Sequence, residues 1–231
     1  YVGARELLHG GDRYCLWLTN ASTPDMQDSP VLKERIELVR EFRAKSKAAS
    51  TREAAVSAHL FRQLAQPDTS YLCIPAHVSE TRPYFLAARF GSDVITSNAN
   101  FLAEDDDGFI FAVISSTMFI TWQRTVGGRI KSDLRFNKLL TWNTFPLPPV
   151  SAEQRGRIIL AGEAVQVARE LQPGVALADL YAPGAISVAL AAAHNELDVC
   201  VDALFGIKSA HPSELERQEL LFANYVQQAT A

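Results

Sequence analysis

The sequence predicts an α+β fold in which a mixed helix and sheet domain, residues 1–150, is followed by a small all-helical domain, residues 151–231. Short apolar runs separated by turn residues occupy the first part, whereas apolar residues recur at helical spacing in the second. Between them, the segment NTFPLPPVS carries three prolines within four positions, which exclude a helix and disfavour a central strand. The chain of 231 residues is 48% hydrophobic, so it can bury a core.

The elements of the first part are predicted from their periodicity. Residues 31–47 have the pattern of an amphipathic helix, with one apolar side formed by Leu32, Ile36, Val39 and Phe42. Strand-like runs follow at residues 71–74, 84–88, 93–96 and 109–114. The segment EDDDG, residues 104–108, lacks the spaced ligands and closing glutamate of an EF-hand, so we expect a plain acidic turn.

A second helix is expected after this turn and the run at 109–114. Ser115 or Ser116 can cap it, Met118 and Trp122 would point inward, and two glycines at 127 and 128 would end it. In the second part, one helical pattern precedes a Pro-Gly break and another spans residues 186–204. The apolar positions of these two patterns are Ile158, Ile159, Ala161, Val165 and Ala168, and then Leu190, Ala193, Leu197, Val201 and Leu204.

Charge and cysteine usage exclude several classes of protein. The net charge of −4 argues against a protein that coats nucleic acid by bulk electrostatics. Residues 1–150 nevertheless carry 17 basic and 16 acidic side chains, whereas residues 151–231 carry 5 and 10, so a polyanion would meet the first part. The apolar run at 109–120 is too short and too polar to span a membrane.

Cys15, Cys73 and Cys200 lie outside any disulfide or zinc spacing, and we expect them to be buried thiols in a reducing cytoplasm. The chain begins with Tyr1 and has no signal-peptide pattern, which suggests a piece of a longer protein. It contains no P-loop, no dinucleotide-binding glycine pattern, no hydrolase motif and no spaced histidine set. His194, in an apolar stretch, is expected to be buried and hydrogen-bonded. The chain therefore shows no catalytic site, no cofactor site and no metal site.

The segment GGRIKSDLRFN, residues 127–137, places a charge at every second position and is named here the alternating segment. A period of two is the strand period, so Ile130, Leu134 and Phe136 would pack inward while the charges project outward. Lys131 and Asp133 on one strand would lie about 6 to 7 Å apart. Because Lys can donate to guanine O6 and N7, and Asp can accept from cytosine N4, this pair suits a G·C base pair in the major groove.

Other side chains around the alternating segment are candidates for further DNA contacts. Arg135 could add a second base contact or hold a phosphate, and four residues are expected to hold the phosphate backbone: Arg124, Arg129, Ser132 and Lys138. The alternative is a solvated edge strand whose charges neutralise one another. In that case the chain would be a protein-interaction or assembly module, without direct base readout.

The run SSTMFITWQRTVGGRIKSDLRFNKLLTWNTFPLPP, residues 115–149, resembles the target-recognition domain of MmeI-like (type IIL) restriction-modification enzymes. The shared pattern is a Ser-x-Met helix, a GR-L-K-S-D-Y-R-Y-S-like segment and an exit of the form YN-x-FP-x-P. GGDRYCLWL, ERIELVREFRAKSK and YLCIPAHVSETRPYF support the resemblance upstream. Downstream, LADLYAPGAISVALAAAHNELD is similar to the family's C-terminal helical domain.

The resemblance implies that this chain recognises double-stranded DNA for an upstream domain of the same polypeptide, an S-adenosylmethionine-dependent adenine-N6 DNA methyltransferase. A nuclease domain requiring Mg²⁺ often precedes it, although a phage-defence methyltransferase without its own nuclease is a related alternative. The positions matching Lys131 and Asp133 would specify one base pair, with G on the recognised strand, and Arg135 matches another recognition position. A further determinant would lie at residues 97–100, where Asn98 and Asn100 could read adenine.

This sequence departs from the family pattern at a few places. Phe119 stands where the family often has His, Phe136 and Asn137 replace Tyr-Ser, and Leu147 replaces a Trp. We expect these to be packing positions.

Overall fold

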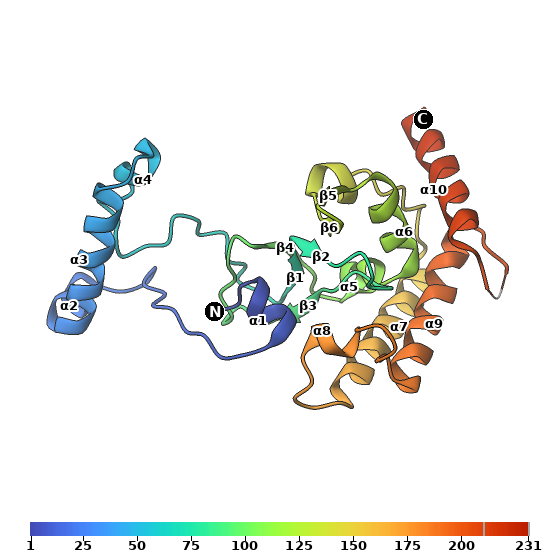
Figure 1. Ribbon diagram of the computed structural model, residues 1–231, viewed down its shortest axis with the longest axis horizontal. Coiled ribbons are helices and arrows are strands. Elements are labelled where there is room, and N and C mark those ends of the chain that lie inside the picture. Colours follow the sequence, from blue (N-terminus) through green and yellow to red (C-terminus); the bar gives the residue numbers. More distant parts are fainter. Residues whose placement is uncertain (210, 231) are drawn as a thin grey trace. The chain divides into compact units, whose positions relative to one another are not determined.

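The computed structural model describes residues 1–209 and 211–230, which form two compact units (Figure 1). One unit is Tyr14–Gln66, and the other combines Tyr1–Arg13 with Pro67–Ala231. No helix among the described residues is long and apolar enough to cross a membrane.

The unit Tyr14–Gln66 contains helices α2 (Thr23–Asp28), α3 (Pro30–Ala44) and α4 (Ala49–Glu53). The predicted amphipathic helix is therefore confirmed as α3, which Ser29 caps and Pro30 begins. Its apolar side is only partly covered, however, with Leu32 and Ile36 half-buried. Phe42 is 76% exposed, and Ala58 is the only buried side chain described within this unit.

The larger unit holds two small antiparallel sheets, besides helix α1 (Ala4–His9) at its N-terminal end. The first sheet has the order β3-β1-β4, with β3 at Ala88–Phe90, β1 at Tyr71–Pro75 and β4 at Asn100–Glu104. The second has the order β2-β6-β5, with β2 at His77–Val78, β6 at Asp133–Arg135 and β5 at Gly128–Ile130.

The predicted strands are only partly correct. The run at 71–74 is confirmed as the buried central strand β1. Of the predicted run at 84–88, residues 84–87 are buried but pair with no strand. The strand β3 begins only at Ala88. Residues 93–96 form a turn with one isolated bridge, between Val2 and Thr96. The run at 109–114 is helix α5 (Phe109–Ile114), so the strand prediction is wrong there.

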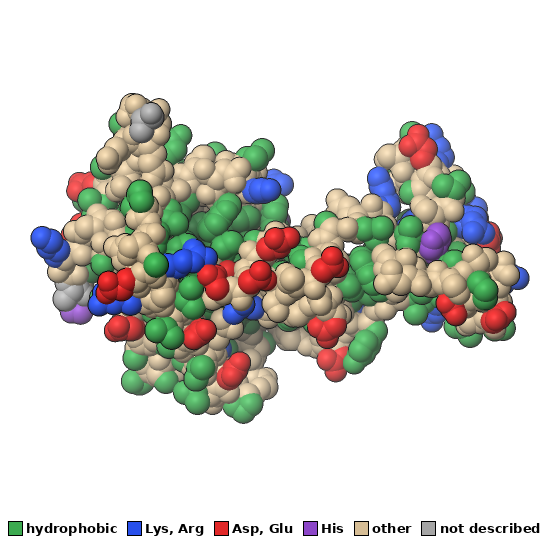
Figure 2. Space-filling model, turned by 180° about the vertical axis from the view of Figure 1, so that it is seen from behind, with side chains coloured by type: hydrophobic (Ala, Val, Ile, Leu, Met, Phe, Trp, Pro, Cys, Tyr) green, Lys and Arg blue, Asp and Glu red, His purple; other side chains and the backbone are tan. Residues whose placement is uncertain are grey.

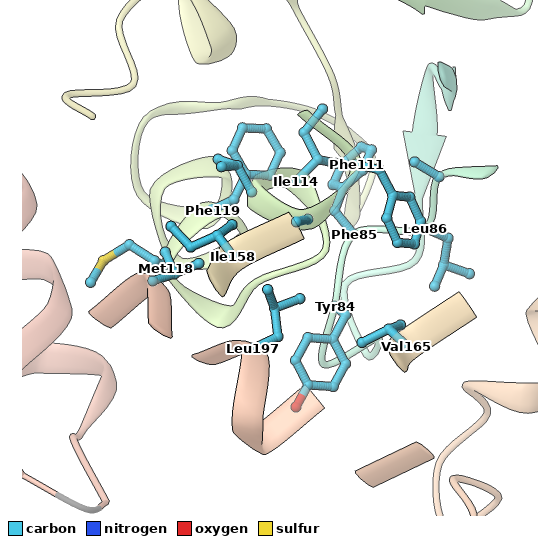
Figure 3. Packing of buried hydrophobic residues seen from close by; sticks show 14 of the residues in the cluster. Tyr84, Phe85, Leu86, Phe111, Ile114, Met118, Phe119, Ile158, Val165 and Leu197 are labelled. Carbon is cyan, nitrogen blue, oxygen red and sulfur yellow. The ribbon is translucent and has the colours of Figure 1, made fainter. Parts of the chain in front are cut away.

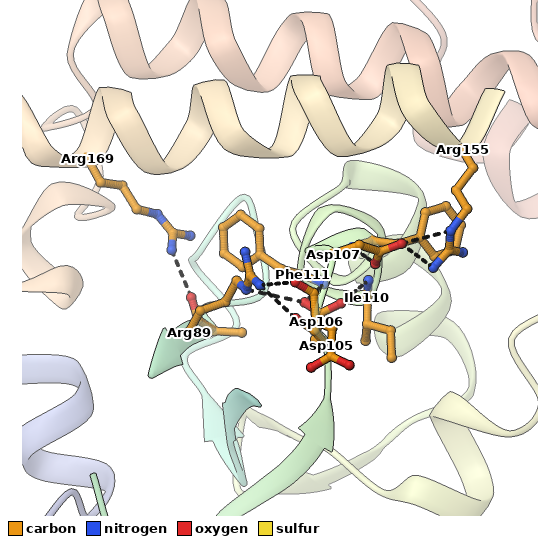
Figure 4. A network of polar contacts seen from close by, with 10 residues as sticks. Arg89, Asp105, Asp106, Asp107, Ile110, Phe111, Arg155 and Arg169 are labelled. Atoms are coloured by element: carbon orange, nitrogen blue, oxygen red, sulfur yellow. Dashed lines mark hydrogen bonds and ion pairs between the residues drawn. The ribbon is translucent and has the colours of Figure 1, made fainter. Parts of the chain in front are cut away.

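The acidic turn explains why a helix begins at Phe109 (Figure 4). The carboxylate of Asp105 accepts hydrogen bonds from the backbone N–H groups of Ile110 and Phe111, at 2.9 and 3.0 Å. Asp107 accepts from the Phe109 N–H at 3.1 Å and from the guanidinium of Arg155 at 2.7 and 3.0 Å. These contacts satisfy donors at the start of a helix, so the plain acidic turn is an N-terminal cap.

Helix α6 (Thr117–Val126) follows with the predicted cap. Ser116 Oγ accepts from the Phe119 N–H at 3.2 Å, and Met118 and Trp122 are buried. A short π-helix, η1 (Lys138–Trp142), leads into the proline-rich exit, which contains no helix or strand. The remaining helices are α7 (Ala152–Glu170), α8 (Leu177–Leu180), α9 (Val188–Leu204) and α10 (Glu214–Ala229). The two predicted helical patterns correspond to α7 and α9.

One hydrophobic core joins the helices and the loops of the larger unit (Figure 3). Helix α7 packs against both α9 and α5, and α10 packs against α6. Tyr84, Phe85 and Phe119 from the first part thereby meet Ile158 and Leu197 from the second. The domain boundary at about residue 150 stays a prediction, because side chains from both parts share this core.

The predicted buried histidine is confirmed. His194 is fully buried, its Nε2 lies 2.7 Å from the Tyr181 hydroxyl, and its ring stacks on Tyr84 at 3.6 Å. Burial lowers the pKa of His194 to about 3. Of the three cysteines, Cys73 is buried as expected, whereas Cys15 and Cys200 are only half-buried.

Candidate nucleic-acid interface

The alternating segment is a β-hairpin, so the prediction of a single strand is wrong. Strands β5 and β6 pair with Ile130 opposite Asp133, Arg129 opposite Leu134, and Gly128 opposite Arg135. Lys131 and Ser132 form the two-residue loop between them. Lys131 has a φ of 56°, a left-handed conformation that the first residue of such a tight loop requires.

The hairpin register decides which side chains share a face, since directly opposed residues point the same way. Asp133 and Arg135 lie on the exposed face, and Ile130 lies there too, 45% exposed rather than packed inward as predicted. Leu134 points to the other face and is fully buried, as expected. Phe136, which follows β6, is also buried.

Arg129 lies on the side of Leu134, away from Asp133 and Arg135. Its guanidinium donates to Glu80 Oε2 at 3.0 Å and to the Ser132 carbonyl at 2.9 Å. The side chain braces the hairpin loop, and the role of Arg129 on the DNA backbone stays a prediction. Ser132 is exposed within that loop.

A residue that the sequence did not indicate joins the exposed face. His77 of β2 pairs with Arg135, so the row Gly128, Arg135, His77 crosses the sheet, and the imidazole is exposed. No motif in the segment around His77 predicts that this residue lies beside Arg135. Its place follows from a strand pairing between residues 58 positions apart, which no local pattern can reveal.

Side chains from α6 and an aromatic cluster hold the hairpin in place on its buried side. The buried side chain of Gln123 on α6 donates to the Arg135 carbonyl at 3.0 Å. Gly127 makes this possible, because a Cβ at that position would lie 1.9 Å from Gln123 Nε2. Phe136 then anchors the end of β6 among Phe85, Phe101 and Phe119.

These contacts also account for the departures from the family pattern. Phe119 and Phe136 are buried in the aromatic cluster and Leu147 is half-buried, as expected of packing positions. Asn137 differs: it is exposed, and its side-chain oxygen accepts from the N–H groups of Leu139 and Leu140 to cap η1.

Of the other predicted contact residues, some are exposed and others are engaged in hydrogen bonds or ion pairs within the protein. Lys138 is exposed at the start of η1, and Asn98 is exposed in a turn. Arg124 is occupied, since it donates to the Arg82 carbonyl at 2.8 Å and lies 3.7 Å from Glu214. Asn100 is 8% exposed, and its amide donates to the Val2 carbonyl and Thr96 Oγ1, both at 3.3 Å. Asn100 is therefore a structural residue, and the prediction that it reads a base is not supported.

Three candidates remain unengaged at the tip and outer face of the hairpin. Within the described part of the chain, the side chains of Lys131, Asp133 and Arg135 make no hydrogen bond or ion pair, and all three are exposed. An ammonium, a carboxylate and a guanidinium group thus lie unpaired on a hairpin that other side chains hold in place. This arrangement can donate to and accept from the edges of paired bases.

Comparison with known proteins shows the family of the chain over its whole length. The family model described as "MmeI, target recognition domain" matches residues 1–149, and "MmeI, C-terminal domain" matches residues 150–231. "DNA methyltransferase A" of Bacillus subtilis (strain 168) is 33% identical over 225 residues, which are 97% of this chain and 25% of that protein.

A solved structure is similar over the full length. It is that of the type IIL restriction-modification enzyme MmeI in complex with DNA, with a TM-score of 0.94 and 36% identity. The match covers 100% of this chain and 31% of the enzyme. The chain thus spans about a quarter to a third of these relatives.

Proposed function

The chain belongs to the family of MmeI-type target-recognition and C-terminal domains, and from this premise we propose that it reads the sequence of double-stranded DNA. The observation that carries the proposal is the free trio Lys131, Asp133 and Arg135 on a braced hairpin, in a fold that matches an enzyme solved with DNA. Residues 1–150 would be the recognition part, and residues 151–231 a helical part that supports it.

The hairpin would enter the major groove with its loop leading. Lys131, at the tip, would donate to guanine O6 and N7, while Asp133 would accept from N4 of the paired cytosine. Arg135 would read an adjacent base or phosphate, and His77 beside it would add a donor or acceptor. Ile130 is suited to an apolar contact such as a thymine methyl group. Lys138 and Ser132 would hold phosphates, and Asn98 would approach from the turn before β4.

We further propose that the chain serves a longer polypeptide in the bacterial cytoplasm that methylates adenine at N6. The relatives' names support DNA methylation and restriction-modification. S-adenosylmethionine, and Mg²⁺ where a nuclease is present, would be bound by parts of the polypeptide outside this chain. Methylation mapping in cells that carry the full-length gene tests this proposal: adenine methylation at one defined site is expected, and its absence would contradict it.

The test of base reading uses the 231-residue chain and a library of randomised DNA duplexes. Retained duplexes should share a motif with a fixed G·C pair. A Lys131→Glu, Asp133→Arg double variant should change that pair and leave the other positions of the motif unchanged. Lys138→Gln is the control, because a phosphate contact affects all sequences alike.

Two results would refute the proposal. Enrichment of the same motif by the double variant would make Lys131 and Asp133 ordinary surface charges. Retention of duplexes without any shared motif would favour the alternative, in which the chain is an interaction module.

A further inference from the structure

The unit Tyr14–Gln66 differs in charge from the rest of the protein. It carries eight basic and six acidic side chains, a net charge of +2, while the remaining residues carry 14 basic and 20 acidic, a net charge of −6. The excess of basic side chains is concentrated in the second half of the unit. Residues 42–66 contain five basic side chains and one acidic one.

Hydrogen bonds within the unit gather these basic side chains at one end. Arg43 donates to the carbonyls of Ala54, Ser57 and Leu60, at 2.8 to 3.0 Å, which folds the chain after α4 back against the end of α3. Arg43 is thereby a structural residue, since its guanidinium is used in these bonds. The other basic residues of this stretch lie around the fold that it creates.

Lys45, Lys47, Arg52 and Arg62 form what we name the basic patch, and all four are exposed. Arg52 donates to the Ser46 and Lys47 carbonyls, both at 2.9 Å. Arg62 donates to the hydroxyls of Ser50 and Thr51, the residues just before Arg52. On the face shown in Figure 2, Lys and Arg side chains of this unit gather mainly toward α4, and Asp and Glu mainly toward α2.

Little negative charge neutralises the basic patch. Lys45 pairs with Glu41 at 3.2 Å along α3. In the described part of the chain, Lys47, Arg52 and Arg62 have no carboxylate within ion-pair distance. Several exposed cations without carboxylate partners, spread along one surface, fit the successive phosphates of an extended polyanion.

We propose that the basic patch binds the phosphate backbone of double-stranded DNA, so that the unit Tyr14–Gln66 supplies affinity without reading sequence. This inference rests on the proposed function, which puts a DNA duplex on the same chain. Phosphate contacts position a protein and carry no sequence information, whereas base contacts specify. The patch and the hairpin therefore divide affinity and specificity between two units.

The test measures the salt dependence of DNA binding by the full 231-residue chain. Lys45→Gln with Lys47→Gln removes two cations but keeps the bonds of Arg43, Arg52 and Arg62. Each lost phosphate contact should reduce the slope of log K against log salt by about 0.9. Between 50 and 200 mM salt, the wild type should accordingly lose roughly tenfold more affinity than this variant. The preferred sequence should not change.

Lys33→Gln with Arg35→Gln is the matched control, because it removes two exposed cations from α3 outside the basic patch. Its salt slope should equal that of the wild type. An unchanged slope in the Lys45, Lys47 variant would overturn the inference, as would equal losses in both variants. A change in preferred sequence would also overturn it, since it would make the patch a base reader.

The two proposals fail differently. If the chain selects no sequence motif but the Lys45, Lys47 variant still shows the smaller slope, the proposed base reading fails and the phosphate surface stands. If single-stranded RNA shows the same affinity and the same change of slope, the surface is not one for duplex DNA and the inference fails. Absence of any binding to duplex DNA at 50 mM salt would overturn it as well.

Discussion

Lys131 combines an unfavourable backbone conformation with a proposed function. Among the described residues it is the only non-glycine residue with a positive φ, at 56°. For an ordinary L-residue this conformation costs about 1 kcal/mol, and glycine is the usual occupant of this loop position. A side chain kept where glycine would fold more easily is consistent with a role in binding.

Replacing Lys131 with glycine should therefore separate stability from recognition. We expect Lys131→Gly to raise the free energy of unfolding by roughly 0.5 to 1 kcal/mol, because glycine removes the strain at positive φ. The same variant should lose the preference for the fixed G·C pair. Urea unfolding and duplex-library selection measure the two effects. Ser132→Gly, next in the loop and without a positive φ, is the control and should not be stabilised.

The sequence could predict the part of the candidate site that depends on exposure alone, because a local pattern indicates which side chains point to solvent. Lys131, Asp133 and Arg135 were chosen from their local alternation and are exposed, while their contacts with bases stay a prediction. The face on which Arg129 lies could not be predicted, because a hairpin turn reverses the chain and puts it on the opposite face from Asp133. Asn100 was misjudged because burial against Val2 depends on a contact between distant parts of the sequence.

At the scale of elements, the main error concerns α5. Residues 109–114 form a short continuous apolar run, and such a run is compatible with a buried strand or a buried helix. The deciding interactions come from Asp105, whose carboxylate caps the first turn, and from α7, which packs against the helix. Longer elements such as α7 and α9 were predictable, since their apolar period repeats over several turns.

The contact of α5 with α7 depends on a glycine, which gives a direct test of their packing. A Cβ at Gly162 would lie 2.6 Å from the Ala112 Cβ and 3.2 Å from its Cα. Gly162→Ala should therefore force the two helices apart and lower the free energy of unfolding by about 1 to 3 kcal/mol.

Gly156 provides the matched control in the same helix. A Cβ there meets nothing within 4 Å, so Gly156→Ala should stabilise the protein by about 0.5 to 1 kcal/mol through helix propensity alone. Thermal and urea unfolding of both variants give the comparison. Equal effects of the two substitutions would show that α5 and α7 are less closely packed than the structure indicates.

At the scale of the whole molecule, the two compact units differ in how well they are supported. The larger unit has a continuous core, whereas a single buried side chain is described in Tyr14–Gln66. The sequence predicted the amphipathic helix α3 correctly, but it could not reveal that Val39 and Phe42 of its apolar side remain exposed, because burial depends on the surrounding chain. Exposed apolar side chains on α3, next to a basic surface, suit a unit that becomes more stable when it binds another molecule.

The parts before and after residue 150 are joined by a buried carboxylate as well as by the core. Asp198 on α9 accepts hydrogen bonds from the Thr117 N–H at 2.7 Å and the Thr117 hydroxyl at 2.5 Å, at the start of α6. Asp202 and Arg217, paired with each other at 2.6 Å, contribute opposite charges nearby. Burial outweighs the hydrogen bonds and raises the pKa of Asp198 from 3.8 to about 6.

This raised pKa makes stability depend on pH. The folded protein holds the Asp198 proton up to about pH 6, whereas the unfolded chain releases it near pH 4. Because the folded state binds more protons in this window, the contribution of Asp198 to the free energy of unfolding falls as pH rises from about 4 to 6. A pKa difference of about two corresponds to roughly 3 kcal/mol. Above about pH 6 the contribution is constant.

Asp198→Asn removes the titrating group and should remove this fall. The wild type should therefore lose up to roughly 3 kcal/mol more stability than the variant between pH 4 and pH 6, measured by urea unfolding across that range. Asp179→Asn, at an exposed position on α8, is the control and should follow the wild-type curve. Parallel curves for wild type and Asp198→Asn would mean that the carboxylate is ionised in the folded protein throughout. The junction between α6 and α9 would then be held by a charged group, and acid rather than neutral pH would weaken it.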